Sequence, residues 1–298
     1  MFAITLMLGL AACTHLASAP SPIDPSVERA TLADLNAVCC RQAEEFPRPL
    51  VAIADLGAPV FGRITRLFES RPGYLSDKLD AQAHLRPQFR PLDMALITSD
   101  ARLSNNLLPG AFSHVAIYLG TESELRRMGL WDHPSIVPHQ AEIAGGGVFI
   151  EAVSPAVHLA PFDHVFNADR LVLLRSHLPS ASARREAIAH FYSHIGTPFD
   201  YRFDGSTEDC LFCTELAEHV LQQLALESAP IYDRPVLLPD QIILTALNGS
   251  RRLTFVDYVE AYPLRWEVGS RADLIAKLHT RWRGDPGAAR HPITAGLN

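Results

Sequence analysis

Residues 196–220 read GTPFDYRFDGSTEDCLFCTELAEHV. A turn rich in Gly, Pro and Asp leads into a segment, residues 213–226, whose apolar side chains recur at helical spacing. This apolar stripe consists of Cys213, Leu216, Ala217, Val220 and Leu224. The pattern predicts an amphipathic helix that begins at Cys213 and directs the sulfur of this residue toward the rest of the fold.

A cysteine at the beginning of a helix is a candidate nucleophile. The N–H groups and the dipole at a helix N-terminus stabilise the thiolate, which is the reactive form of cysteine. Acids in the preceding loop favour the thiol instead, unless they point outward; they are Asp200, Asp204, Glu208 and Asp209. The alternative role for Cys213 is that of a small, buried apolar side chain, which is a common state of cysteine.

A candidate base lies upstream, in the predicted strand FSHVAIYL at residues 112–119. Strand alternation places His114, Ala116 and Tyr118 on one face of this strand. An imidazole can take the proton of a cysteine and later return it to a leaving group. The alternative is that His114 is a hydrogen-bonded core or surface histidine, one of 13 in the chain.

A candidate third member is Glu151, in the predicted strand VFIEAV at residues 148–153. A carboxylate among apolar neighbours needs a partner. If this strand lies beside the strand of His114, Glu151 can hold the imidazole in the tautomer that activates a nucleophile. The alternative is a carboxylate that faces water at the edge of a sheet.

The remaining patterns predict an α+β fold. Strands are predicted at residues 93–98, 112–119, 148–153 and 171–175, and helices at 25–45 (capped by Ser26), 182–195 (capped by Ser182) and 213–226. Residues 71–91 are predicted as a loop, 121–147 as an insertion, and the chain from Gly284 onward as a disordered tail. Because the predicted strands cluster between residues 93 and 175, and helices follow that region without alternating with strands, we expect an antiparallel sheet.

Two segments together resemble the YiiX-like, permuted papain-like (NlpC-type) cysteine hydrolases and amidases. They are residues 93–120, DMALITSDARLSNNLLPGAFSHVAIYLG, and residues 196–220 quoted above. The resemblance implies a circularly permuted papain-like fold, in which an antiparallel sheet packs against the helix that carries the nucleophile. It implies Cys213 as nucleophile, His114 as base and Glu151 as the residue that orients the base. Cys210 is a rival nucleophile, but Cys213 is the one aligned with the Cys-Thr-Glu-Leu start of the helix.

The N-terminus is similar to that of a bacterial lipoprotein. An uncharged run ends in Leu10-Ala11-Ala12-Cys13, which resembles a lipobox with Cys13 as the lipidated residue, although no Lys or Arg precedes it. We therefore expect a signal peptide at 1–12, a lipidated N-terminus, tether and helical extension at 13–85, a catalytic domain at 86–265, and a C-terminal helix and tail at 266–298. The expected location is the bacterial cell envelope, where the protein is lipid-anchored in the outer membrane and faces the periplasm.

Composition and net charge limit the classes of protein and of partner that we expect. The chain of 298 residues is 48% hydrophobic and 20% charged, which is typical of globular proteins. Its formal net charge is -7 and it has no basic stripe, so nucleic acid is not an expected partner. The resemblance implies a peptide, cell-wall or acyl-lipid substrate, cleaved through an acyl-enzyme thioester without any metal or organic cofactor.

Several alternatives stay open at this stage. A disulfide between Cys210 and Cys213, or between Cys39 and Cys210, fits an oxidising periplasm. A zinc site at the two cysteines of residues 210–213 lacks a second, closely spaced ligand pair, since Cys39 and Cys40 are adjacent and far upstream. The alternative functions are acyl transfer, a non-catalytic envelope-binding lipoprotein and a zinc-binding structural protein.

Overall fold

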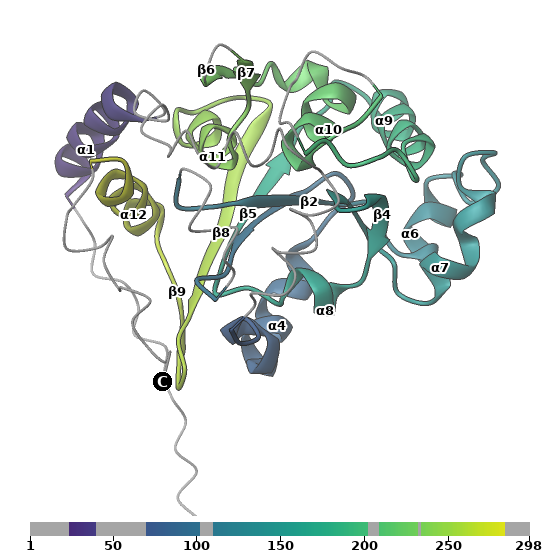
Figure 1. Ribbon diagram of the computed structural model, residues 1–298, viewed down its shortest axis with the longest axis horizontal. Helices are drawn as coiled ribbons and strands as arrows, with labels where there is room; N and C mark the ends of the chain where they lie inside the picture. Colours follow the sequence, from purple (N-terminus) through teal and green to yellow (C-terminus); the bar gives the residue numbers. More distant parts are fainter. Residues whose placement is uncertain (1–23, 40–69, 102–109, 202–208, 232–233, 284–298) are drawn as a thin grey trace, which may run out of the picture.

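A seven-stranded antiparallel sheet forms the centre of the computed structural model, which describes residues 24–39, 70–101, 110–201, 209–231 and 234–283 (Figure 1). The strand order is β4-β3-β2-β1-β5-β8-β9. The strands are β1 (Met94–Thr98), β2 (His114–Tyr118), β3 (Phe149–Val153), β4 (Ala156–Ala160), β5 (Arg170–Ser176), β8 (Leu253–Ala261) and β9 (Trp266–Val268). A separate hairpin joins β6 (Ala229–Ile231) to β7 (Arg234–Val236).

Both faces of the sheet are covered, as Figure 1 shows. One face packs against the longer helices, which are α1 (Pro25–Val38), α9 (Ala181–Ser193), α10 (Cys213–Val220), α11 (Pro239–Leu247) and α12 (Arg271–Arg283). The other face packs against α4 (Leu79–Leu85) and α8 (Phe162–Val165). The sheet thus lies between two hydrophobic cores: the first is shared with the longer helices and the second with α4 and α8. In β1, Met94 and Leu96 belong to the first core, whereas Ala95 and Ile97 belong to the second. This double burial explains why β1 is apolar throughout and does not alternate with polar residues.

The predicted α+β fold with an antiparallel sheet is confirmed, and the four predicted strands correspond to β1, β2, β3 and β5. The expectation that only helices follow residue 175 was wrong, because β8 and β9 complete the sheet. Strand β8 contains two acids that make it look polar. Asp257 lies 2.7 Å from the His84 ring, and Glu260 accepts a 2.9 Å hydrogen bond from Lys277. Tertiary partners therefore allow these acids inside a strand.

Three helix boundaries differ from the predictions. Helix α1 ends at Val38, and its N-cap is Asp24, whose carboxylate accepts the N–H of Ser26; residues 40–45 of the predicted helix lie outside the described part. Helix α9 is capped by Ser180 and not by Ser182. Helix α10 ends at Val220, where a short 3₁₀ turn, η5 (Gln222–Leu224), replaces its predicted last turn. The predicted tail from residue 284 also lies outside the described residues.

Residues 71–91 are not the loop that we predicted. They form η2 (Tyr74–Asp77), α4 and η3 (Arg86–Gln88). The carboxylate of Asp169 accepts two hydrogen bonds from the Arg71 guanidinium and one from the Tyr74 N–H. Its ionised form thereby fixes the start of this segment on the sheet, and long-range contacts of this kind leave no local signature in the sequence.

The 121–147 insertion is also ordered and packs against the first core. It contains α6 (Glu122–Arg127), η4 (Val137–His139) and α7 (Gln140–Ala144). Thr121 and Glu124 cap α6 reciprocally, and Leu125 and Ile143 are buried. Within the described part of the chain, no helix combines the length and the apolar character that crossing a membrane requires.

Asp240, at the start of α11, fixes the segment that leads into β2. Its buried carboxylate accepts hydrogen bonds from the N–H groups of Ala111 and Phe112 at 2.7 and 2.9 Å, and from the indole N–H of Trp282 at 2.7 Å. Gly110 has a φ of +111°, and a Cβ there would lie 2.8 Å from the Asp240 carboxylate. Burial raises the pKa of Asp240 to about 6, so the group is ionised at neutral pH.

Replacing Asp240 with asparagine should destabilise the protein by about 2–4 kcal/mol, because an amide N–H₂ would then oppose buried N–H donors. The measurement is urea unfolding at pH 7. The matched control is Asp132→Asn, at an exposed position, which should leave the free energy of unfolding within about 0.5 kcal/mol of wild type. Equal stability of the two variants would contradict the role of Asp240.

Candidate active site

The start of α10 is held by the residues that follow Cys213. The Thr214 hydroxyl donates a 2.6 Å hydrogen bond to the Leu237 carbonyl, and the Glu215 carboxylate accepts the Phe212 N–H at 2.9 Å. Both side chains are buried. Cys213 is the first residue of the helix and is partly exposed, against the core. The Cys-Thr-Glu motif therefore fixes where the helix starts and where the thiol lies.

The turn at residues 196–201 ties this helix start to the β3–β4 hairpin. Two backbone hydrogen bonds join the turn to Val157: the Gly196 N–H donates to the Val157 carbonyl, and the Val157 N–H donates to the Thr197 carbonyl, both at 2.9 Å. At the other end, the Asp200 N–H donates to the Leu211 carbonyl at 3.1 Å. Helix α10 itself contacts β2 and β3. The two signature segments of the sequence therefore meet in space.

His114 is the first residue of β2 and contacts both other predicted members of the site. Its Nε2 lies 2.6 Å from Oε2 of Glu151, and its ring is also hydrogen-bonded to Cys213. Only 14% of its side chain is exposed. Burial lowers the pKa of His114, but the negative charges of Cys213 and Glu151 and the hydrogen bonds to them outweigh burial and raise it to about 10. The imidazole is thus set to carry a proton between Glu151 and Cys213.

Glu151 occupies the middle of β3 and is 1% exposed. Its second oxygen, Oε1, lies 3.3 Å from Nε2 of His158 and 3.0 Å from Nε2 of His164. Burial raises the pKa of Glu151, yet its contacts with His114, His158 and His164 hold that pKa well below the ordinary value. One buried carboxylate therefore lies against three imidazoles, and the alternative of a water-facing acid at a sheet edge does not apply.

The sheet register explains how these side chains meet. Alternation puts Phe149 and Glu151 on the face that packs against α4 and α8, the same face as Ala116 and Tyr118 of β2. His158 of β4 is directly opposite Glu151 in the antiparallel pairing. His164 reaches the same oxygen from α8, on that face of the sheet.

The structure brings Cys213, His114 and Glu151 together, as predicted, and adds two histidines that the sequence analysis missed. The sequence did contain a signal for His158. A tight turn after residue 153 places position 158 on the next strand, directly opposite position 151. Among the described residues, Cys39, Cys210 and Cys213 are thiols and form no disulfide. Of the two rival nucleophiles, it is Cys213 whose side chain is hydrogen-bonded to His114.

Comparison with known proteins agrees with this arrangement. Residues 90–236 match the family described as permuted papain-like amidase enzyme, YaeF/YiiX, C92 family. Over this segment, which is just under half of the chain, the protein matches that amidase family. The predicted resemblance is thereby confirmed, and the family consists of papain-like cysteine hydrolases. No curated protein and no solved structure matches the chain.

The matched amidase segment contains all three predicted site residues together with His158 and His164. Cys13 and Cys40 lie outside the described residues, as do Asp204 and Glu208 of the loop before α10. Asp200, another acid of that loop, is buried, whereas Asp209 is exposed.

Glu151→Gln should lower the pKa of His114, because an amide supplies no negative charge to the imidazolium. The value of about 10 lies above the ordinary 6.5, so the protonated imidazole stabilises the fold fully below about pH 6.5 and loses that contribution as pH rises through about 10. The measurement is an NMR titration of ¹³C-labelled histidine, with the His114 signal identified by its absence in His114→Ala. The midpoint of the His114 titration should lie at a lower pH in Glu151→Gln than in the wild type.

The matched control is Glu142→Gln, since Glu142 lies 3.9 Å from a different ring, that of His139. This variant should leave the His114 titration unchanged. If Glu151→Gln also left it unchanged, the carboxylate would not control the protonation of His114.

Proposed function

We propose that Cys213, His114 and Glu151 form the catalytic triad of a cysteine hydrolase that cleaves amide or acyl bonds through a thioester intermediate. One observation carries this proposal. A buried imidazole is hydrogen-bonded to the Cys213 thiol and, at its Nε2, to the buried Glu151 carboxylate at 2.6 Å. This is the nucleophile–base–orienter arrangement of triads, which are recognised by geometry and not by chain order.

The mechanism follows from the two sides of the His114 ring. Because Nε2 faces Glu151, Nδ1 is the nitrogen left to take the proton of Cys213. The thiolate attacks the substrate carbonyl, and backbone N–H groups at the start of α10, which have no partner within the helix, are the proposed oxyanion donors. The imidazolium then protonates the leaving group, and water attacks the thioester to release the acid and regenerate the thiol.

Glu151 keeps the ring oriented and stabilises the imidazolium that each turnover forms. His158 and His164 are positioning residues in this scheme, because they contact the carboxylate on the side away from His114. The circular permutation fits the chain order His114, Glu151, Cys213, in which the base precedes the nucleophile.

The proposed substrate is a peptide or N-acyl amide, or an ester lipid, of the bacterial cell envelope. Two features support this class: the match to an amidase family and the lipobox-like sequence that ends at Cys13. A lipid on Cys13 would tether the catalytic domain to a membrane and leave it facing the periplasm. Acyl transfer would use the same thioester and differ only in the acceptor.

The triad predicts that Cys213 is alkylated quickly at pH values below the ordinary thiol pKa of about 8.5. In His114→Ala the rate at neutral pH should fall at least about tenfold, since the imidazole no longer accepts the proton. The measurement is iodoacetamide labelling of the Cys13→Ser chain at a series of pH values, with each site quantified by mass spectrometry. Cys210 serves as the internal control, and its labelling should be insensitive to the His114 substitution.

An inert Cys213, together with an unchanged labelling profile in His114→Ala, would remove the catalytic proposal. The non-catalytic envelope-binding lipoprotein would then take its place.

Lipidation at Cys13 predicts that the protein sediments with membranes after expression in a bacterial host. Cys13→Ser should move it to the soluble fraction, because the acyl chains supply the membrane affinity. Fractionation followed by immunoblotting measures this, with Cys39→Ser as the matched control that stays with the membrane. Equal partitioning of wild type and Cys13→Ser would contradict the anchor.

A further inference from the structure

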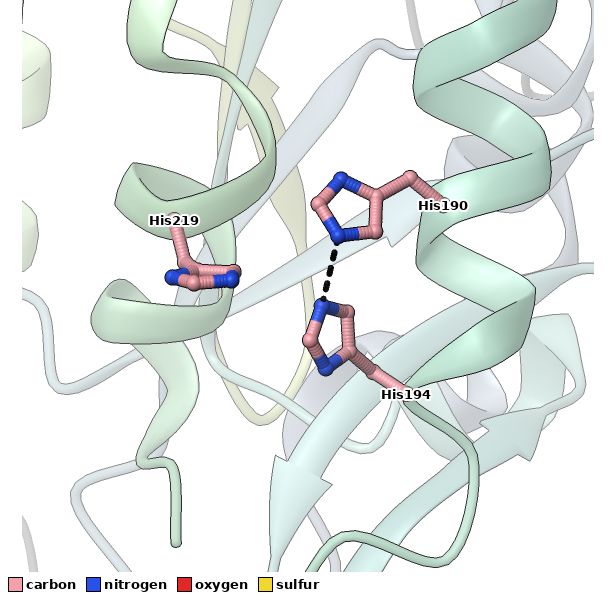
Figure 2. A group of neighbouring side chains, drawn as sticks. All are labelled: His190, His194 and His219. Carbon is pink, nitrogen blue, oxygen red and sulfur yellow. Dashed lines mark hydrogen bonds between the residues drawn. The ribbon is translucent and has the colours of Figure 1, made fainter. Parts of the chain in front are cut away.

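Three histidines gather where α9 meets α10, at a place that the proposed hydrolysis does not use. Figure 2 shows His190 of α9 and His194, the C-cap residue of that helix, extending toward His219 of α10, with the three rings turned toward one another. The ligand nitrogens of the three side chains all lie within 4.8 Å of one another. His190 is exposed, and His194 and His219 are half-buried, so a small ion can reach the cluster from solvent.

The spacing within the cluster suits a tetrahedral metal ion. His190 and His194 are four residues apart on one helix, so their side chains share a face. Their Nε2 atoms are 3.2 Å apart. Zinc–nitrogen bonds of about 2.0–2.1 Å in a tetrahedral site place two ligand nitrogens about 3.3–3.4 Å apart. The third ring, His219, has its centroid 5.6 and 5.1 Å from those of His190 and His194, and a rotation of its side chain closes the remaining distance.

We infer that His190, His194 and His219 form a binding site for a divalent first-row transition metal of the Zn²⁺ type, which cross-links α9 to α10. Three imidazoles with no thiolate or carboxylate among them suit Zn²⁺, Cu²⁺, Ni²⁺ or Co²⁺ and not Mg²⁺ or Ca²⁺, which prefer oxygen ligands. Water would occupy the fourth position of a zinc ion held by three protein ligands.

This site is distinct from the proposed catalytic triad. His219 follows Cys213 by six residues on the same helix, a rise of about 9 Å. A single ion cannot bond both, because its ligand atoms lie within about 4 Å of one another. The metal instead fixes the far end of α10 to α9, while Thr214 and Glu215 fix the end that carries the thiol. The inference therefore stands whether or not the chain is a hydrolase.

The test is a Co²⁺ titration of the full chain carrying Cys13→Ser and Cys213→Ser, purified without a histidine tag. Absence of the catalytic thiol prevents metal capture at the triad. We expect one equivalent of Co²⁺ to bind, with the visible d–d absorption of a nitrogen-ligated ion and without the near-ultraviolet band of a thiolate–cobalt bond. His190→Ala and His219→Ala should each weaken binding at least about tenfold, whereas His133→Ala, at an exposed histidine outside the cluster, should not.

A second measurement distinguishes the three-histidine site, which joins two helices, from a site formed by His190 and His194 alone. Zn²⁺ should raise the midpoint of thermal unfolding of the parent and not that of His219→Ala, since only the three-histidine site links two helices. The midpoints in EDTA show whether each variant is folded. Undiminished Co²⁺ affinity in His219→Ala would leave only the pair His190–His194 and overturn the inference. A thiolate–cobalt band, or binding that survives both His190→Ala and His219→Ala, would place the metal elsewhere and overturn the inference as well.

Discussion

The buried charge of Glu151 is the constraint around which the site is built. An ionised carboxylate inside a sheet is costly unless hydrogen bonds and opposite charge surround it. Here β2, β4 and α8 each bring one imidazole to it: His114, His158 and His164. The hydrogen bond that compensates the carboxylate is the same one that orients His114 toward Cys213. The hydrogen bond between His114 and Glu151 therefore contributes both to the stability of a buried charge and to the geometry of the site.

Helix α10 connects the proposed catalytic triad with the proposed metal site. Its first turn holds Cys213 in place through the hydrogen bonds of Thr214 and Glu215, and its last turn carries His219 beside the histidines of α9. An eight-residue helix is too short to be stable by itself and depends on tertiary contacts for its position. A metal between α9 and α10 would supply one such contact at the end of the helix opposite the thiol.

The strands that the sequence predicted correctly are those buried on both faces or with clear alternation. β1 is apolar at nearly every position, and β2 and β3 alternate around His114 and Glu151 in a way that the two cores confirm. β8 escaped prediction because Asp257 and Glu260 interrupt its apolar pattern, and their partners, His84 and Lys277, come from other elements. The helical segment at residues 74–88 was not predicted for the same reason, since the residue that anchors it, Asp169, is distant from it in the sequence.

The sequence by itself determined the α+β class, the family resemblance and three residues of the candidate site, because these depend on local periodicity and on motifs within short segments. Only the tertiary structure decided that His158 and His164 share the carboxylate of Glu151, and that His219 joins the pair on α9. Those contacts depend on strand register and on how helices pack, where a shift of one residue turns a side chain to the opposite face. Such information is distributed over the whole core and is present in no single stretch of the chain.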